Sequence, residues 1–148
     1  MKRTMSFKNW VRITVIGLAL SLCAGAAVAD VVAVVSAKNP VKTMLSNNQI
    51  VDIFLGKANR FPDGSQAVPI DQAEGSAARD EFYLKFAGKS PVQLKAYWSK
   101  IIFTGRGQPP RDVANSIEVK KLLAKYPDTI GYIDQSLVDS SVKMLLAQ

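Results

Sequence analysis

The stretch VPIDQAEGSAARDEF, residues 68–82, decides the fold expected for this chain. It begins as an apolar run, breaks into a polar turn and then starts a helix, so it predicts a strand, a loop and a helix N-terminus. In such a loop the backbone N–H groups around Gly75, Ser76, Ala77 and Ala78 point outward together, where unpaired donors and the helix dipole favour an anion. The stretch therefore indicates an oxyanion site between a strand and a helix.

The same residues also have a purely structural interpretation. Ser76 is an ordinary N-cap residue, and Asp80 and Glu81 already complement the helix dipole in the first turn. Asp71 and Glu74 oppose an anion unless one of them points away or accepts a proton that the ligand carries. A partly protonated oxyanion such as hydrogen phosphate could supply that proton, so both interpretations stay open at this point.

The first 29 residues have the pattern of a signal peptide. A basic region with Lys2, Arg3, Lys8 and Arg12 precedes the apolar run 13–22 and the small residues 27–29, which suit signal peptidase. We expect cleavage after Ala29, secretion to the periplasm and a mature domain over residues 30–148. A signal anchor is the alternative, but about a dozen apolar residues are too few to span a bilayer comfortably.

Composition predicts one globular domain with an unremarkable charge. The chain has 148 residues, of which 48% are hydrophobic and 21% are charged. Removing the four basic residues of the leader from the chain's 19 leaves 15 against 12 acidic residues, a net charge of about +3. No basic stripe interleaved with aromatic residues is present, so we expect no nucleic-acid partner.

The expected mature domain lacks the histidine and cysteine residues that many metal sites and catalytic nucleophiles require. The chain has no histidine, and its one cysteine, Cys23, lies in the predicted leader. The usual zinc, copper and haem ligand sets and the Ser-His-Asp and Cys-His nucleophiles are therefore excluded. Carboxylates such as Asp63 do not reproduce a calcium-binding loop, and adjacent carboxylates on a helix point in different directions. We expect no metal, no cofactor and no catalytic site.

Apolar periodicity and capping signals predict a mixture of strands and helices. Val31 to Val35 is a β-branched run typical of a buried strand. Ser46 and Ser90 each precede a glutamine by three residues, the spacing of a capping box, and Pro91 suits the first helical position. The expected elements are strands at 31–35, 67–70, 130–133 and 141–146, helices at 46–55, from 77 to Gly88 and from 91 onward, and one or two helical segments from Asp112 to Tyr126, stopped by Pro127. This order predicts an α/β sandwich.

Two further residues allow a functional interpretation beside a structural one. Trp98 lies on the apolar stripe of Leu94, Tyr97, Ile101 and Ile102, where a tryptophan is more often core than a stacking platform for a ligand. Arg106 lies between two glycines in the loop 104–110, which could carry its guanidinium to an anion or simply form a solvated turn.

Four short motifs resemble one family when they are taken in order. These are IFLGK at 53–57, EGSAA at 74–78, GRG at 105–107 and IGYI at 130–133. Their order and spacing resemble the phosphate-binding proteins of bacterial phosphate ABC transporters. The resemblance implies a single lobe of a type II periplasmic-binding-protein-like fold, a mixed sheet flanked by helices, because the mature chain of about 119 residues suffices for one lobe of the family's two.

The resemblance also implies roles for particular residues. Glu74 would accept the phosphate proton, while Gly75 and Ser76 keep the family's loop. Ala77 and Ala78 stand where the family usually has glycine and threonine, and Gln72 stands near its usual arginine. Either Arg79 or Arg106 would then supply the missing cation.

The expected function is that of a secreted, non-enzymatic solute-binding protein for phosphate or a similar oxyanion. Its partners would be an ABC permease or a membrane sensor, and a second copy of the chain could complete the cleft that a single lobe leaves open. The alternative is a periplasmic interaction or sensory module that keeps the lobe and has lost its ligand.

Overall fold

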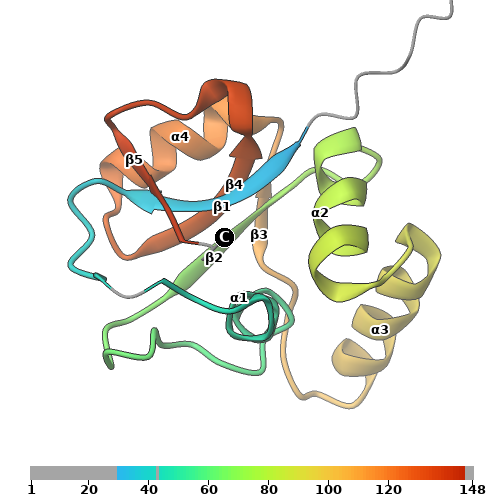
Figure 1. Cartoon of the computed structure of the whole chain (residues 1–148). Coiled ribbons are helices and arrows are strands. Elements are labelled where there is room, and N and C mark those ends of the chain that lie inside the picture. Colours follow the sequence, from blue (N-terminus) through green and yellow to red (C-terminus); the bar gives the residue numbers. More distant parts are fainter. Residues whose placement is uncertain (1–29, 43, 146–148) are drawn as a thin grey trace, which may run out of the picture.

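A computed structural model describes residues 30–42 and 44–145 of the chain (Figure 1). The predicted signal peptide lies outside these residues, as does Leu146 at the end of the last expected strand. Within them the elements are β1 (Val31–Ser36), α1 (Asn47–Phe54), β2 (Val68–Gln72), α2 (Ala77–Ala87), α3 (Pro91–Phe103), β3 (Arg111–Val113), α4 (Ser116–Lys125), β4 (Thr129–Asp134), the 3-10 helix η1 (Gln135–Leu137) and β5 (Val142–Met144). No helix in this part of the chain is long and apolar enough to cross a membrane.

The strands form one mixed sheet in the order β3-β2-β4-β1-β5. β2 runs parallel to β3 and β4, whereas β1 runs antiparallel to β4 and β5. Consequently the carboxyl ends of β2, β3 and β4 lie at the same edge of the sheet. In an open α/β sheet, that edge is where ligands usually bind.

Helices cover both faces of the sheet. α1, α2 and α3 lie on one side, and α4 lies on the other (Figure 1). Alternate residues of β1 serve the two cores: Val31, Ala33 and Val35 belong to the core under α1 and α2, and Val34 belongs to the core under α4. The expected mixed sheet flanked by helices is confirmed.

The predicted helix starts are confirmed by their hydrogen bonds. Ser46 and Ser90 each accept from the backbone of the glutamine three residues later, and each glutamine side chain accepts from the serine amide, so both capping boxes are complete. α2 ends at Gly88, which has a φ of 61°. A left-handed residue of this kind suits glycine because it has no Cβ.

The expected start of the helical region at Asp112 was wrong. Val113 was expected in a helical segment, but Arg111–Val113 forms a short strand that pairs with Ile70–Gln72 of β2. Three residues with two charges carry no apolar alternation, so only the neighbouring strand reveals this one. The helical region that follows is a single helix, α4, capped by the side chain of Asn115.

The buried stripe predicted for α3 is also narrower than expected. Leu94 and Trp98 are buried, Tyr97 and Ile101 are partly buried, and Ile102 is 45% exposed. In α2 the buried residues are Phe82, Tyr83 and Phe86. α3 therefore packs along one line only and leaves its last turn in solvent.

Gly131 allows α4 to approach the sheet closely. A Cβ at Gly131 would lie 2.5 Å from Cγ1 of Val119, a fully buried residue of α4. Because Val119 is β-branched, its side chain has few ways to yield. The close contact between α4 and β4 thus requires glycine at this position.

We expect Gly131→Ala to lower the free energy of unfolding by about 1–3 kcal/mol, the usual cost of overpacking a core. Gly107→Ala is the matched control, since its Cβ would meet only Ile101 at 3.6 Å. Urea denaturation followed by circular dichroism measures both. Val119→Ala in the Gly131→Ala background should recover part of the loss, and an unchanged Gly131→Ala midpoint would contradict this packing.

Candidate functional site

The loop between β2 and α2 makes a tight turn before the helix begins. The Ser76 amide donates to the Ala73 carbonyl at 3.0 Å, and Gly75 has a φ of 86°, a conformation that suits glycine. Ser76 Oγ accepts from the Arg79 amide at 3.3 Å. Ser76 is therefore the N-cap of α2, and this role leaves its hydroxyl hydrogen available to another acceptor.

The first two amides of α2 are open. Within residues 30–42 and 44–145, the N–H groups of Ala77 and Ala78 have no hydrogen-bond acceptor. Ala77 is exposed and Ala78 is partly exposed. Free amides at the positive end of a helix attract an anion, so this end of α2 has the donors that the sequence predicted.

Two carboxylates near this loop pair with groups on other elements. Glu81 accepts the Val31 amide at 3.3 Å, which ties α2 to the start of β1. Glu74 is exposed and lies 3.6 Å from Lys95 of α3, a weak pair because both side chains are well solvated. Neither carboxylate therefore covers the start of the helix.

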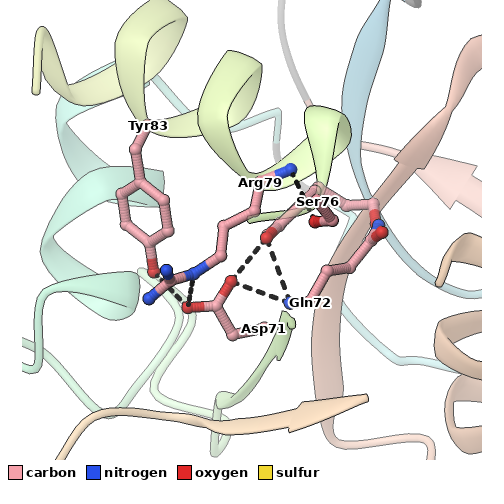
Figure 2. Close-up of polar contacts among 6 residues, drawn as sticks. Asp71, Gln72, Ser76, Arg79 and Tyr83 are labelled. Atoms are coloured by element: carbon pink, nitrogen blue, oxygen red, sulfur yellow. Dashed lines mark hydrogen bonds and ion pairs between the residues drawn. The ribbon is translucent and has the colours of Figure 1, made fainter. Parts of the chain in front are cut away.

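Asp71, directly before Gln72 at the end of β2, is the buried charge of the region. It is 2% exposed, and its two oxygens accept four hydrogen bonds (Figure 2). Oδ1 accepts from the Tyr132 hydroxyl and from the Gln72 amide at 2.8 Å, and Oδ2 accepts from the Tyr83 hydroxyl at 2.8 Å and from Arg79 Nε at 3.3 Å. These four donors replace the water that the buried carboxylate has lost.

Arg79 lies beside this carboxylate and close to the surface. Its side chain is 15% exposed and its guanidinium lies 5.6 Å from the centre of the Tyr83 ring. Burial alone would lower the pKa of Arg79, but the charge and the hydrogen bond of Asp71 outweigh burial and raise it. Within the described part of the chain, only Nε of this guanidinium has a hydrogen-bond partner.

Two small cavities meet at Arg79. Their volumes are about 200 and about 190 Å³, and both are lined by Glu74, Arg79 and Pro109. The first extends along α3, and the second extends from the carboxyl end of β2 to Pro110 and Asp112 at β3. Their remaining lining residues are Lys95, Trp98, Ser99 and Ile102 in the first cavity and Asp71, Gln72, Pro110 and Asp112 in the second.

The residues predicted for the site are thus only partly brought together. Glu74 and Arg79 share both cavities, while residues 75–78 form the adjoining helix start and line neither cavity. Arg106 is exposed in the loop after α3 and lines neither cavity. Of the two arginines that could supply the cation, Arg79 is therefore the better placed.

Other residues of the region were not predicted for it. Lys95, Ser99 and Pro109 reach the cavities through the packing of α3 and its following loop, which local sequence does not reveal. Trp98 is only 5% exposed, as expected for a core residue, although it also lines the first cavity.

Gln72 is a structural residue in this arrangement. It is buried, and its side-chain Nε2 donates to Ser116 Oγ at 3.1 Å and to the Tyr132 carbonyl at 3.0 Å. These bonds tie β2 to β4 and to the start of α4. Its side-chain Nε2 is therefore already paired and does not take the role of the arginine that the family usually has near this position.

A larger cavity lies at the opposite end of the parallel strands. It has a volume of about 400 Å³, and its lining includes the apolar residues Val68, Ile70 and Leu122 and the charged residues Arg111 and Asp128. Because it adjoins the amino ends of β2 and β4, it lies away from the edge where α/β sheets usually bind ligands. Among the described residues no cluster of carboxylate, histidine or cysteine side chains could hold a metal ion.

The two tyrosines on Asp71 should make stability sensitive to alkali. Burial, followed by the charge of Asp71, raises the pKa of Tyr83 and of Tyr132 above the ordinary value of 10.0. The folded state then holds these protons more tightly than the unfolded state. Their contribution is complete below pH 10 and is lost as the pH rises above it, by about 1.4 kcal/mol per pH unit for each tyrosine.

Urea denaturation between pH 8 and pH 11 tests this expectation. Tyr83→Phe should reduce the alkaline slope of the unfolding free energy, whereas Tyr126→Phe, at an exposed position outside the Asp71 cluster, should leave the slope unchanged. An equal slope in wild type and Tyr83→Phe would contradict the assignment.

Comparisons with known proteins agree with this fold. No protein-family model and no curated protein sequence matches the chain. The structure is similar to that of a Clostridium perfringens protein described as a phosphate ABC transporter substrate-binding protein, solved with bound phosphate: 25% identity, a TM-score of 0.57, and coverage of 78% of this chain and 43% of the other.

A second similar structure is an ABC-type phosphate transport receptor from Vibrio cholerae. Its TM-score is 0.60 at 20% identity, and the match covers 78% of this chain and 44% of the receptor. The chain thus spans less than half the length of either protein. At the level of fold, the family resemblance is confirmed: the five-stranded mixed sheet with its flanking helices is similar to part of each of these two proteins.

Proposed function

We propose that the chain is a non-enzymatic solute-binding protein of the phosphate-transport type. It holds phosphate or a similar oxyanion at Glu74, Gly75, Ser76, Ala77 and Ala78, with Arg79 as the nearby cation. The predicted signal peptide would export it to the periplasm, where an ABC permease or a membrane sensor would be its partner.

The open amides of Ala77 and Ala78 carry this proposal. They lie at the positive end of α2, next to a serine whose hydroxyl hydrogen is uncommitted. A tetrahedral oxyanion has acceptor oxygens for several such donors at once. The similarity in fold to a protein solved with bound phosphate supports the same ligand class.

Glu74 would give the site its preference for a protonated oxyanion. Its carboxylate is exposed at the rim and its pairing with Lys95 is weak, so it is free to accept a hydrogen bond from the hydroxyl of hydrogen phosphate. Sulfate carries no proton at neutral pH and would be repelled. We therefore expect phosphate and arsenate to bind more tightly than sulfate.

Isothermal titration of the mature chain with phosphate, arsenate and sulfate tests the function directly. A single lobe leaves its ligand partly in solvent, so we expect weak binding. Heat from phosphate and arsenate at millimolar concentration supports the proposal, and no heat from any of the three anions would refute it.

We expect Ala77→Pro to weaken phosphate binding by about tenfold or more, because it removes one N–H group that would bond a charged ligand. Proline is well tolerated at the first position of a helix, and the extended φ of −72° and ψ of 138° at Ser76 suit a residue before proline. α3 already begins with Pro91 after a serine of the same conformation.

Asn47→Pro is the matched control, since it makes the same change at the first residue of α1 behind Ser46. Both variants should keep the wild-type melting temperature within a few degrees. Equal phosphate affinity of wild type and Ala77→Pro would show that the amide does not contact the ligand.

One observation favours the interaction module as a second candidate. Val92 is 79% exposed and Phe103 is 93% exposed, and their spacing of 11 residues places them on the same outward face of α3. Such a face suits a protein partner or a second copy that would cover the cavities beside it. Light scattering with and without phosphate, on wild type and Phe103→Ser, would detect self-association through this face.

A further inference from the structure

We infer that Asp71 is a positioning residue for the proposed oxyanion site: its buried carboxylate anchors Arg79 through Nε and presents the two terminal nitrogens of the guanidinium to the cavities that Arg79 shares with Glu74 of that site. The inference rests on the proposed function for its ligand, but the orientation of Arg79 can be tested without any ligand. It assigns a role to a residue that does not itself contact the anion.

The carboxylate is held from three elements. Tyr83 and Arg79 reach it from α2, and the Gln72 amide follows it on β2 (Figure 2). The Tyr132 hydroxyl reaches it from β4. These four donors fill the acceptor positions of a fully buried group. Asp71 therefore has a fixed orientation and no capacity left for a ligand.

Because the guanidinium is planar, holding its Nε also fixes the direction in which its two terminal nitrogens point. With Nε held 3.3 Å from Asp71 Oδ2, the two terminal nitrogens have no partner within the described residues. Arg79 lines both cavities, and its side chain is 15% exposed. The guanidinium thus uses one donor for the protein and keeps the others for an anion, which a lysine ammonium could not do in the same way.

Positioning by Asp71 and simple charge repulsion by Asp71 predict opposite effects of Asp71→Asn on anion affinity. Asp71→Asn removes a negative charge near the site, and this change alone would strengthen anion binding. If Asp71 acts by positioning Arg79, the same variant should instead weaken binding, because the guanidinium loses its anchor. Loss of affinity in Asp71→Asn therefore reports position rather than charge.

The first measurement follows the Arg79 Nε–H resonance by nitrogen-15 NMR in the ligand-free protein, with the signal assigned by its absence in Arg79→Lys. In wild type we expect a resolved signal in slow exchange with water, as for a buried hydrogen bond to a carboxylate. In Asp71→Asn the signal should be lost to exchange. Asp139→Asn is the matched control, because Asp139 also pairs with a cation, Lys120, but outside this cluster.

The second measurement is a double-mutant cycle on phosphate affinity. We expect Asp71→Asn to weaken phosphate binding about tenfold or more, and Arg79→Ala to do the same. In the Arg79→Ala background, Asp71→Asn should cause no further loss of affinity and can only strengthen binding through the lost negative charge, because Asp71 then has no guanidinium to position. Independent, additive losses would overturn the proposal.

If Asp71→Asn does not fold, the phosphate affinity of Arg79→Lys tests the proposal instead. Its single ammonium would pair with Asp71, so phosphate should bind as weakly as in Arg79→Ala; wild-type affinity in Arg79→Lys would overturn the proposal. Unchanged or tighter phosphate binding by Asp71→Asn, or an unchanged Nε–H signal, would overturn it too. Should wild type bind none of the three anions, the proposed function fails, and the NMR result alone decides whether Asp71 orients Arg79.

Discussion

The structure depends on one buried carboxylate. Removing the charge of Asp71 from water costs several kcal/mol unless donors replace its hydration, and here two hydroxyls, an amide and a guanidinium do so. Those donors come from β2, β4 and α2, so their convergence fixes how α2 sits on the sheet. Phe82 adds an apolar contact at the same place, since its ring stacks on Tyr132 at 4.0 Å. The open end of α2 is held where it is by this cluster.

Much of the fold could be predicted because its signals are local. The capping boxes at Ser46 and Ser90 need only residues three positions apart, and the apolar runs of β1 and β4 mark buried strands on their own. β3 could not be predicted in this way, since its three residues are a strand only by virtue of lying beside β2. The exposed end of α3 was missed for a similar reason: its apolar spacing continues past the point where the neighbouring elements stop covering it.

In the candidate site too, the features formed by adjacent residues could be predicted, and those formed by distant residues could not. The capped helix start at Ser76 and the glycine turn before it follow from adjacent residues, and sequence indicates both. Sequence shows Asp71 only as an acidic residue that opposes an anion, because its partner Tyr132 lies 61 residues further along the chain. Lys95 and Pro109 reach the cavities through tertiary packing. From the sequence alone, Asp71 is therefore only a charge that opposes anion binding, whereas the structure shows the donors that surround it.

The place of β1 in the sheet has a consequence for how the chain matures. Within residues 30–42 and 44–145 it is the first strand to be synthesised, yet it lies between β4 and β5, and Val34 pairs with Gly131 about 100 residues later. Contacts this far apart are made late and slowly, because a long loop must close before they form. The amino-terminal part cannot complete its sheet by itself, so the order of the sheet is settled only after the carboxy-terminal strands have been made.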